Sequence, residues 1–371
     1  MKKWFIQTAA LSVSFGLAAT SPSTPSSTPS STPSSTKGSQ LQQGYEVSST
    51  QFPAIYNQPA RYDVCGNWDF FLGGSFIYWQ ASQDGMDVAV TADSSNSLPL
   101  NGSMIIQNFN YDPGFKVTAG WNTIYDNWSL FADYTWYRGN STLSATAPSG
   151  QFFFYQSWIF FAVVSNDTGP SLTSKWKLGM DLVDASLSRP FYQGPKLTVT
   201  PYFGARAAWI RQALRLAQQV LPTVAIASNP VVSHVRSNCW GLGPRGGLSC
   251  NWLVGCGFSL LGDASASVLF TRYTKVTAQV DQADVAGAPI HAAIHDYNCV
   301  RPNGTGVLGL NWGSYLNKQR YHLDFAASYE FTVFWQQNMM RQFVDSYNIG
   351  MGASAGDLFL HGLTVSAQFD F

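Results

Sequence analysis

The last fourteen residues, Leu358–Phe371, read LFLHGLTVSAQFDF, and their side chains alternate strictly between two faces. The nearly all-apolar face carries Phe359, His361, Leu363, Val365, Ala367, Phe369 and Phe371, while the other ends in Thr364, Ser366, Gln368 and Asp370. A period of two is the period of a β-strand. One such strand fits any β-sandwich, so the rest of the chain has to decide the fold.

Composition narrows the class of protein. Of the 371 residues only 11% are charged, against roughly 25% in soluble proteins, and 15% are aromatic. Lys plus Arg equals Asp plus Glu, at 21 each, so no excess of charge points to nucleic acid as a partner. Mean hydropathy is only −0.05, which does not describe a helical membrane protein. These values favour a chain that shows apolar and polar residues alternately.

The N-terminus predicts export. MKKWFIQTAALSVSFGLAAT combines Lys2 and Lys3 with an apolar stretch and small residues before a cleavage point, so residues 1–19 are expected to be a signal peptide. Residues 20–66 begin with repeated Ser/Thr/Pro units and are expected to be a spacer and lead-in. No later stretch approaches the ~18 apolar residues that a spanning helix needs.

Alternation recurs throughout residues 67–371. Ten strands are expected at approximately 68–80, 113–123, 127–138, 173–188, 196–211, 237–249, 256–271, 304–314, 319–336 and 358–371. The clearest runs are longer than the five or six residues usual in soluble proteins, and aromatic residues gather near the ends of their apolar faces. The fold class is therefore all-β: a transmembrane antiparallel up-and-down barrel of about ten strands. Further strand-like pieces at 86–92 and 152–164 leave twelve to fourteen strands open.

Connection lengths predict the topology. Short turns are expected at Tyr125-Asp126, at 189–194, at 250–255 and at 315–318, with stretches of about 20–35 residues between the hairpins. Short periplasmic turns and long outer loops are typical of bacterial outer-membrane barrels. The predicted location is therefore the outer membrane, with many passes and with membrane lipid as a partner. Phe371 would be the barrel-closing terminal signal that the outer-membrane assembly machinery recognises.

Four long motifs carry a family resemblance. They are SRPFYQGPKLTVTPYFGARAAWIRQ, WGLGPRGGLSCNWLVGCGFSLLGDASASVLF, YHLDFAASYEFTVFWQQNMM and GDLFLHGLTVSAQFDF. Over roughly residues 66–371 the chain resembles the family of the Legionella major outer membrane protein and the related barrels of Chlamydia-like bacteria (Chlamydiales). The resemblance implies an abundant porin that passes small hydrophilic solutes, with envelope-structural and host-contact roles and no catalytic residues.

Charged residues on the polar faces are expected to line the lumen, because Arg or Lys on the lipid face costs about 2–4 kcal/mol at the midplane. The constriction candidates are Arg206, Arg245, Asp263, Asp324, Asp133 and Glu330, with Lys116 and Asp370 also facing inward. They would form either a mixed-charge pore lining or a salt-bridge plug, since ten strands leave a lumen that side chains can fill. We favour a general diffusion porin of modest bore; the alternative is a structural or adhesive surface barrel with a blocked lumen. Replacing Arg206 and Arg245 by Ser is expected to leave folding largely intact.

Other motifs are weaker. Gly241-Leu-Gly243-Pro-Arg-Gly246 matches a dinucleotide pattern without a following helix, and small residues where strands crowd explain it better. His291 and His295 have metal-like spacing but no further ligand, so no metal, cofactor or catalytic set is expected. Of five cysteines, Cys250 and Cys256 flank a predicted turn and are expected to form a disulfide. A leftover thiol could link to other envelope proteins, as the chlamydial resemblance suggests.

Overall fold

The structure, a computed structural model, describes Val64 and residues 69–93, 103–123, 125–147, 152–158, 168–219, 230–281, 290–349 and 355–371. The predicted signal peptide (1–19) lies outside the described residues, and so does the predicted spacer (20–66) apart from Val64.

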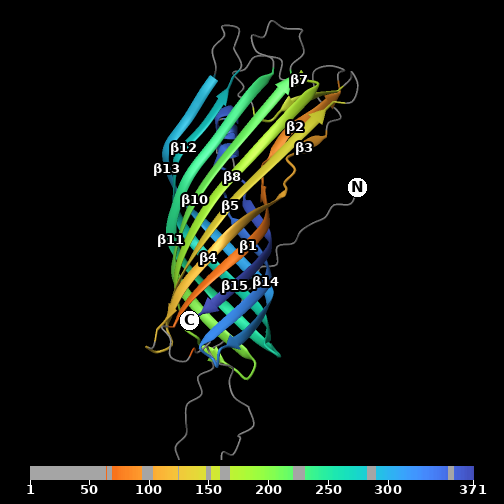
Figure 1. Ribbon diagram of the computed structural model, residues 1–371. Coiled ribbons are helices and arrows are strands. Elements are labelled where there is room, and N and C mark those ends of the chain that lie inside the picture. Colours follow the sequence, from red (N-terminus) through yellow and green to blue (C-terminus); the bar gives the residue numbers. More distant parts are fainter. Residues whose placement is uncertain are drawn as a thin grey trace, which may run out of the picture. The chain divides into compact units, whose positions relative to one another are not determined.

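Ten antiparallel strands close into one barrel (Figure 1). They are β1 (Phe70–Gln83), β4 (Tyr111–Asn122), β5 (Ser129–Thr146), β8 (Ser171–Ser188), β10 (Leu197–Gln219), β11 (Val231–Gly255), β12 (Phe258–Val280), β13 (Ile290–Leu316), β14 (Tyr321–Phe334) and β15 (Leu358–Asp370). Each strand pairs with the next along the chain, and β15 returns to β1, from Phe71↔Asp370 to Gln83↔Leu358. The predicted ten-stranded barrel is confirmed, and its closing strand is the C-terminal segment.

The remaining elements lie in the connections. The strands β2 (Asp87–Asp93), β3 (Met104–Ile106), β6 (Phe152–Gln156) and β7 (Thr168–Gly169) form a small separate sheet. The two-residue β9 (Tyr192–Gln193) pairs with β10, and the helix α1 (Met339–Ile349) lies between β14 and β15. The extra strand-like pieces expected near 86–92 and 152–164 thus pair with each other and do not widen the barrel. Among the described residues, no helix has the length and apolar character that crossing a membrane requires.

The two ends of the barrel differ as predicted. At one end, called here the turn end, short connections join β4 to β5, β8 to β10, β11 to β12 and β13 to β14. Asp126 and Asn127 make the first of these turns with φ of 54° and 56°. All longer connections lie at the opposite end, called here the loop end. The C-terminus lies at the turn end (Figure 1).

The predicted disulfide is wrong. Cys250 and Cys256 are both free, because β11 continues to Gly255 and the turn begins only at Cys256, whose φ is 54°. Five extended steps separate Cys250 from Gly255, or roughly 17 Å at ~3.3 Å per residue. A disulfide needs Cα atoms within about 7 Å. The turn expected at 250–255 is therefore displaced toward the C-terminus, and the two sulfurs cannot meet.

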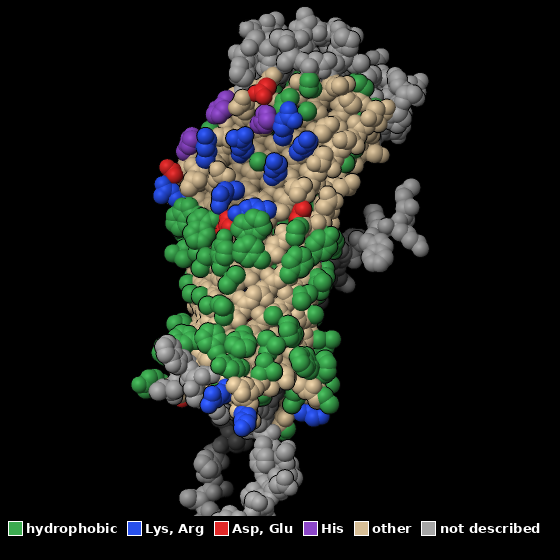
Figure 2. Space-filling model, viewed as in Figure 1, with side chains coloured by type: hydrophobic (Ala, Val, Ile, Leu, Met, Phe, Trp, Pro, Cys, Tyr) green, Lys and Arg blue, Asp and Glu red, His purple; other side chains and the backbone are tan. Residues whose placement is uncertain are grey.

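Outward-facing side chains divide the barrel into two zones. In the half nearer the turn end they are mostly apolar, such as Phe203, Trp209, Leu248 and Val268. Figure 2 shows this zone as a green band, with Lys, Arg and His side chains gathered above it toward the loop end. We call these parts the apolar-walled half and the basic-walled half. The interiors of the two halves also differ: charged side chains are buried in the apolar-walled half, and mainly apolar side chains in the basic-walled half.

Candidate functional site: the barrel interior

Inside the apolar-walled half, buried charged side chains form ion pairs between strands. Arg206 of β10 is only 4% exposed, and its Nε and Nη2 each donate to an Asp184 carboxylate oxygen of β8 at 2.7 Å. Arg245 of β11 places Nη1 3.0 Å from Asp184 Oδ2. One carboxylate therefore serves two guanidinium groups, and its contact with Arg206 has the bidentate geometry that Arg favours.

Further contacts cross the lumen rather than follow the wall. Arg206 Nη1 donates to Asn303 of β13, three strands away around the barrel. Lys116 of β4 pairs with Glu330 of β14 at 2.6 Å, again across three strand steps. Tyr202 donates to Asp263 at 2.9 Å. These bonds connect strands that are two or three positions apart around the barrel.

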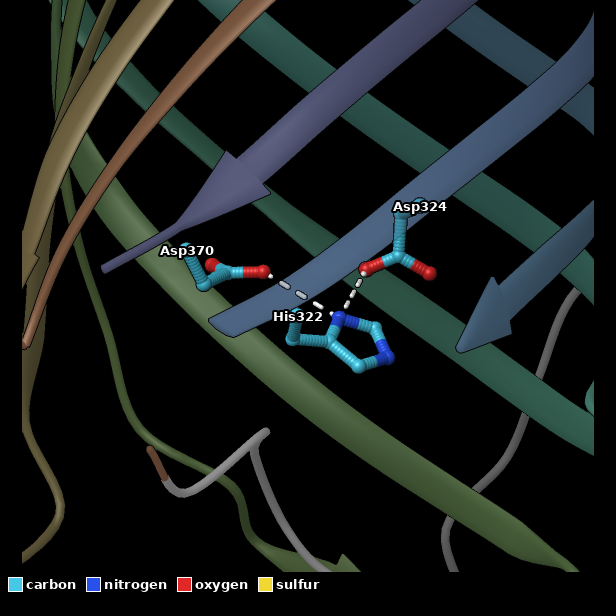
Figure 3. Close-up of side chains that lie close together, drawn as sticks. All are labelled: His322, Asp324 and Asp370. Carbon is cyan, nitrogen blue, oxygen red and sulfur yellow. Dashed lines mark hydrogen bonds and ion pairs between the residues drawn. The ribbon is translucent and has the colours of Figure 1, made fainter. Parts of the chain in front are cut away.

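A third cluster lies near the turn end (Figure 3). His322 Nδ1 lies 3.0 Å from Asp324 Oδ2 and 3.2 Å from Asp370 Oδ2, and all three residues are buried. Their other carboxylate oxygens accept from Asn311 and Gln368, both at 3.0 Å. The three possible ligand atoms lie within 4.8 Å of one another, a spacing that could hold a cation. The carboxylates already contact the imidazole, so the group connects the neighbouring strands β14 and β15.

A cavity of about 900 Å³ occupies the turn-end part of the interior. Its lining includes Arg245, Asp263, Asp133, His322 and Asp370. Asp133 accepts from Thr118 at 2.6 Å. A cavity of this size with charged side chains in its lining has room for water and small solutes, and its lining residues belong to the apolar-walled half.

The interior of the basic-walled half is mainly apolar, with a smaller number of buried polar side chains. A continuous core of buried side chains fills it, contributed by the strands, the small sheet and α1. Its largest fully buried members are Trp79, Trp158, Trp176, Tyr137, Tyr273, Phe154 and Phe334. Gln212 of β10 donates to Gln83 of β1 at 2.6 Å, four strand steps around the barrel. This half is packed like the inside of a soluble protein.

The helix α1 contributes to that core. Met340 and Val344, four positions apart and hence on one face, are fully buried. Asn338 caps the helix by accepting from the Arg341 backbone N–H at 3.1 Å, and its side-chain amide donates to the Asp84 carbonyl at 2.6 Å. Arg341 bonds Asp87 at 2.9 Å. The outer connection that follows β1 is thereby fastened to the helix at two points.

Asp84, whose carbonyl accepts the Asn338 hydrogen bond, also has a shifted pKa. Partial burial, followed by repulsion from the Asp357 carboxylate, raises the pKa of Asp84 above its usual range. The Asp84 N–H donates to the Asp357 carbonyl at 2.9 Å, which fixes the two chain segments beside each other.

All six predicted lumen candidates face the interior, but the structure does not gather them at one constriction. Arg245, Asp263 and Asp133 line the cavity, whereas Arg206, Asp324 and Glu330 do not. Sequence reasoning missed Asp184, the partner of two arginines, and the role of His322. Alternation within β8 and β14 could have placed both side chains inward, yet only strand register brings them to their partners.

The structure also shows where the glycine-rich and histidine motifs lie. Gly243 lies inside β11, where a Cβ would overlap the Val268 carbonyl oxygen of β12, so close strand approach explains this glycine. His291 and His295 lie on β13 and are exposed on the outer wall. The segment that carries them is part of a strand, because β12 and β13 extend well past the apolar band.

Comparison with known proteins agrees with the barrel and its location. The family described as Legionella pneumophila major outer membrane protein precursor matches residues 63–371. No curated protein sequence matches the chain significantly.

The solved structures that resemble the chain include two described as outer membrane proteins. The outer membrane protease OmpT of Escherichia coli has 10% identity and a TM-score of 0.39, covering 81% of this chain and 96% of its own. A major outer membrane protein from Thermus thermophilus has 11% identity and a TM-score of 0.27, covering 81% and 99%. The attachment invasion locus protein Ail of Yersinia pestis has 8% identity and a TM-score of 0.22, covering 82% and 99%. At these TM-scores the likenesses carry no argument about this chain.

Proposed function

We propose that this chain, which belongs to the family of the Legionella pneumophila major outer membrane protein, is a structural barrel of the outer-membrane surface whose lumen is closed to solutes. The observation that carries this proposal is the apolar core that fills the basic-walled half from β1 around to β15. Ions and sugars would have to leave water to cross this core, at a cost of several kcal/mol for each unpaired charge.

The cross-lumen bonds at mid-height support the same proposal. Lys116–Glu330 and Arg206–Asn303 span the interior, so a solute would have to break buried pairs before it reached the apolar core. Ten strands also enclose a lumen narrow enough for side chains to fill, unlike the 16–18 strands of wide porins.

Four expectations from the sequence complete the proposal. The chain reaches the outer membrane through cleavage of the segment 1–19, and Phe371 at the end of the closing strand is read by the assembly machinery. The role is non-enzymatic. The long connections at the loop end are the parts available for host contact.

A diffusion porin is the second candidate function. The polar cavity of about 900 Å³ favours it, because such a cavity is the inner half of a pore. Passage of small hydrophilic solutes past Arg245 and Asp263 would then require α1 and the small sheet to leave the lumen. The cavity supplies an entrance but no exit through the described residues.

Planar-bilayer conductance and liposome swelling of the folded, full-length chain separate the two candidates. A closed barrel gives no conductance steps and admits no small sugars. Regular steps with sugar entry would reject the closed barrel and favour the porin.

A matched pair of variants on α1 sharpens the test. Met340→Asp puts a charge into the buried face of the helix, which should drive α1 out of the core and produce conductance steps or sugar entry. Tyr347→Asp adds the same charge at a residue that is 52% exposed and should leave the barrel closed. If the Met340→Asp variant still migrates as a folded barrel but shows neither conductance steps nor sugar entry, α1 does not close the lumen.

A further inference from the structure

The outer surface of the basic-walled half carries a concentration of cations. The outward Lys and Arg side chains of β8, β10, β11 and β12, called here the basic wall, are Lys175, Lys177, Arg211, Arg215, Arg236, Arg272 and Lys275. Figure 2 shows a blue field of Lys and Arg side chains directly above the green band. The basic wall covers one continuous stretch of sheet, since the four strands are neighbours.

Strand register brings two of these cations side by side. Lys175 of β8 lies opposite Arg215 of β10, which lies opposite His234 of β11. Paired strands are only about 4.8 Å apart, and like charges directly opposite each other destabilise a sheet. The fold keeps an arrangement that costs stability, which is expected where a surface binds anions.

The carboxylates of this wall neutralise only part of it, and one of them, Asp281, lies 3.5 Å from His234 Nε2 at the edge of the sheet. Asp181 bonds Arg138 and Arg211 at 3.0 and 2.9 Å, and Asp296 bonds Arg272 at 2.8 Å. Within the described part of the chain, the remaining basic-wall cations form no salt bridge; these are Lys175, Lys177, Arg215, Arg236 and Lys275. Positive charge is therefore in excess on this face.

A hollow of about 300 Å³ lies among these cations. Arg236, Lys275, His234 and His291 line it, together with polar residues and Asp281. The donors come from three neighbouring strands, β11, β12 and β13. A hollow with several cationic donors suits a group with several acceptor oxygens, such as a phosphate.

The height of the basic wall identifies where its anion would come from. On β10 the large outward apolar side chains end at Trp209, which is 41% exposed, and the next outward side chain is Arg211. At ~3.3 Å per residue, Arg211 and Arg215 stand roughly 7 and 20 Å beyond Trp209 along the strand. Aromatic residues mark the membrane interface, so the basic wall faces the headgroup layer of the outer leaflet.

We propose that the basic wall binds the phosphate groups of an anionic phosphorylated glycolipid in the outer leaflet, with the hollow at Arg236 and Lys275 as the principal phosphate site. The two carboxylate-paired arginines, Arg211 and Arg272, stand at the margin nearer the apolar band. The binding is electrostatic, so it weakens as salt rises. This proposal does not depend on whether the lumen is open or closed.

Binding of a fluorescent bis-phosphorylated lipid A in zwitterionic detergent micelles, by the folded full-length chain, tests the proposal. The wild-type chain is expected to bind it in preference to the same lipid with its phosphates removed. The triple variant Arg215→Gln/Arg236→Gln/Lys275→Gln should weaken binding roughly tenfold or more, since each cation near an anionic headgroup contributes substantially.

The matched control is Lys196→Gln/Lys318→Gln/Arg320→Gln, which removes the same charge at exposed positions of the turn end. It should leave lipid A binding unchanged, while heat-modifiable gel migration verifies that both variants are folded. Equal loss in both variants, or equal binding of the dephosphorylated lipid, would overturn the proposal. Full competition by millimolar inorganic phosphate would also overturn it, by assigning the site to a soluble anion.

Discussion

The same strands form two halves of one barrel, and the two halves place apolar side chains on opposite surfaces. In the apolar-walled half of β10, Phe203 and Trp209 face outward while Arg206 faces the lumen. In its basic-walled half, Arg211 and Arg215 face outward while Leu214 and Leu216 are buried inside. The pleat does not change phase between the two halves; only the placement of apolar residues changes, from odd to even positions. The solvent outside the barrel changes from lipid to water at that point.

This comparison explains the interior as well. Where lipid surrounds the wall, the polar residues must face inward, and there they satisfy one another through Asp184, Glu330 and His322. Where water surrounds the wall, the hydrophobic effect operates as in a soluble protein and collects apolar side chains inside. The apolar core inside the basic-walled half is therefore a consequence of strands that continue beyond the apolar band.

The largest expected effect concerns the charges of the apolar-walled half. Asp184→Ala removes the carboxylate that Arg206 and Arg245 share, leaving two buried cations without it. We expect a loss of about 3–5 kcal/mol in the free energy of unfolding, measured by urea titration in lipid vesicles. Asp184→Asn keeps the volume and one acceptor and should lose less.

The arginines themselves need a revised expectation. Sequence reasoning expected Arg206→Ser and Arg245→Ser to leave folding largely intact, as for lumen residues that contact water. Because Arg206 is buried and bonds both Asp184 and Asn303, we now expect its loss to be destabilising. If Arg206→Ser proves as stable as the wild type, the buried network does not hold this half together.

The second effect concerns the interior of the basic-walled half. Leu214 is 1% exposed within the apolar core, and Thr200 lines the polar cavity on the same strand. Leu214→Asp should cost about 3 kcal/mol, because the new carboxyl has no partner there. Thr200→Asp adds the same group beside water and should cost under about 1 kcal/mol. Similar losses for both, in the same urea titration, would contradict the division of the interior.

The third effect concerns the outer wall. Ala207 and Ala213 are both outward-facing residues of β10, on either side of Trp209. Ala207→Arg places a cation against lipid and should cost about 2 kcal/mol, whereas Ala213→Arg lies among the cations of the basic wall and should cost less than ~1 kcal/mol. Refolding equilibria in vesicles measure both. Equal costs would mean that the membrane boundary does not lie at Trp209.

The smallest effect is a dependence on pH at the α1 anchorage. The pKa of Asp84 is raised above its usual value of 3.8, so the folded chain binds this proton more tightly than the unfolded chain. Stability from Asp84 should therefore increase slightly as pH falls through the raised pKa, and it should be fully present below 3.8. Thermal unfolding from about pH 6 to about pH 3.5 measures this, and Asp84→Asn should remove that component. An unchanged pH profile in the variant would exclude Asp84 as its source.

The sequence by itself determined the fold class, the ten barrel strands, the two unlike ends and the closing strand. Alternation with a period of two can be recognised without knowing the neighbouring strands, because it shows which side chains of one strand share a face. It placed Asp263, Asp324 and Glu330 inward, as the structure has them. The change of apolar parity after Trp209 is also written in the sequence, but the expected strands ended near it and the reversal was missed.

Only the tertiary structure decided which inward residues meet. The pairing of Asp184 with two arginines and the meeting of Lys116 with Glu330 depend on the register and stagger of the closed barrel. The failed Cys250–Cys256 bridge has the same origin, since a turn displaced by a few residues separates them by most of a strand. The position of α1 inside the lumen could not be predicted from the sequence either. An amphipathic helix of eleven residues packs wherever its apolar face finds an apolar partner.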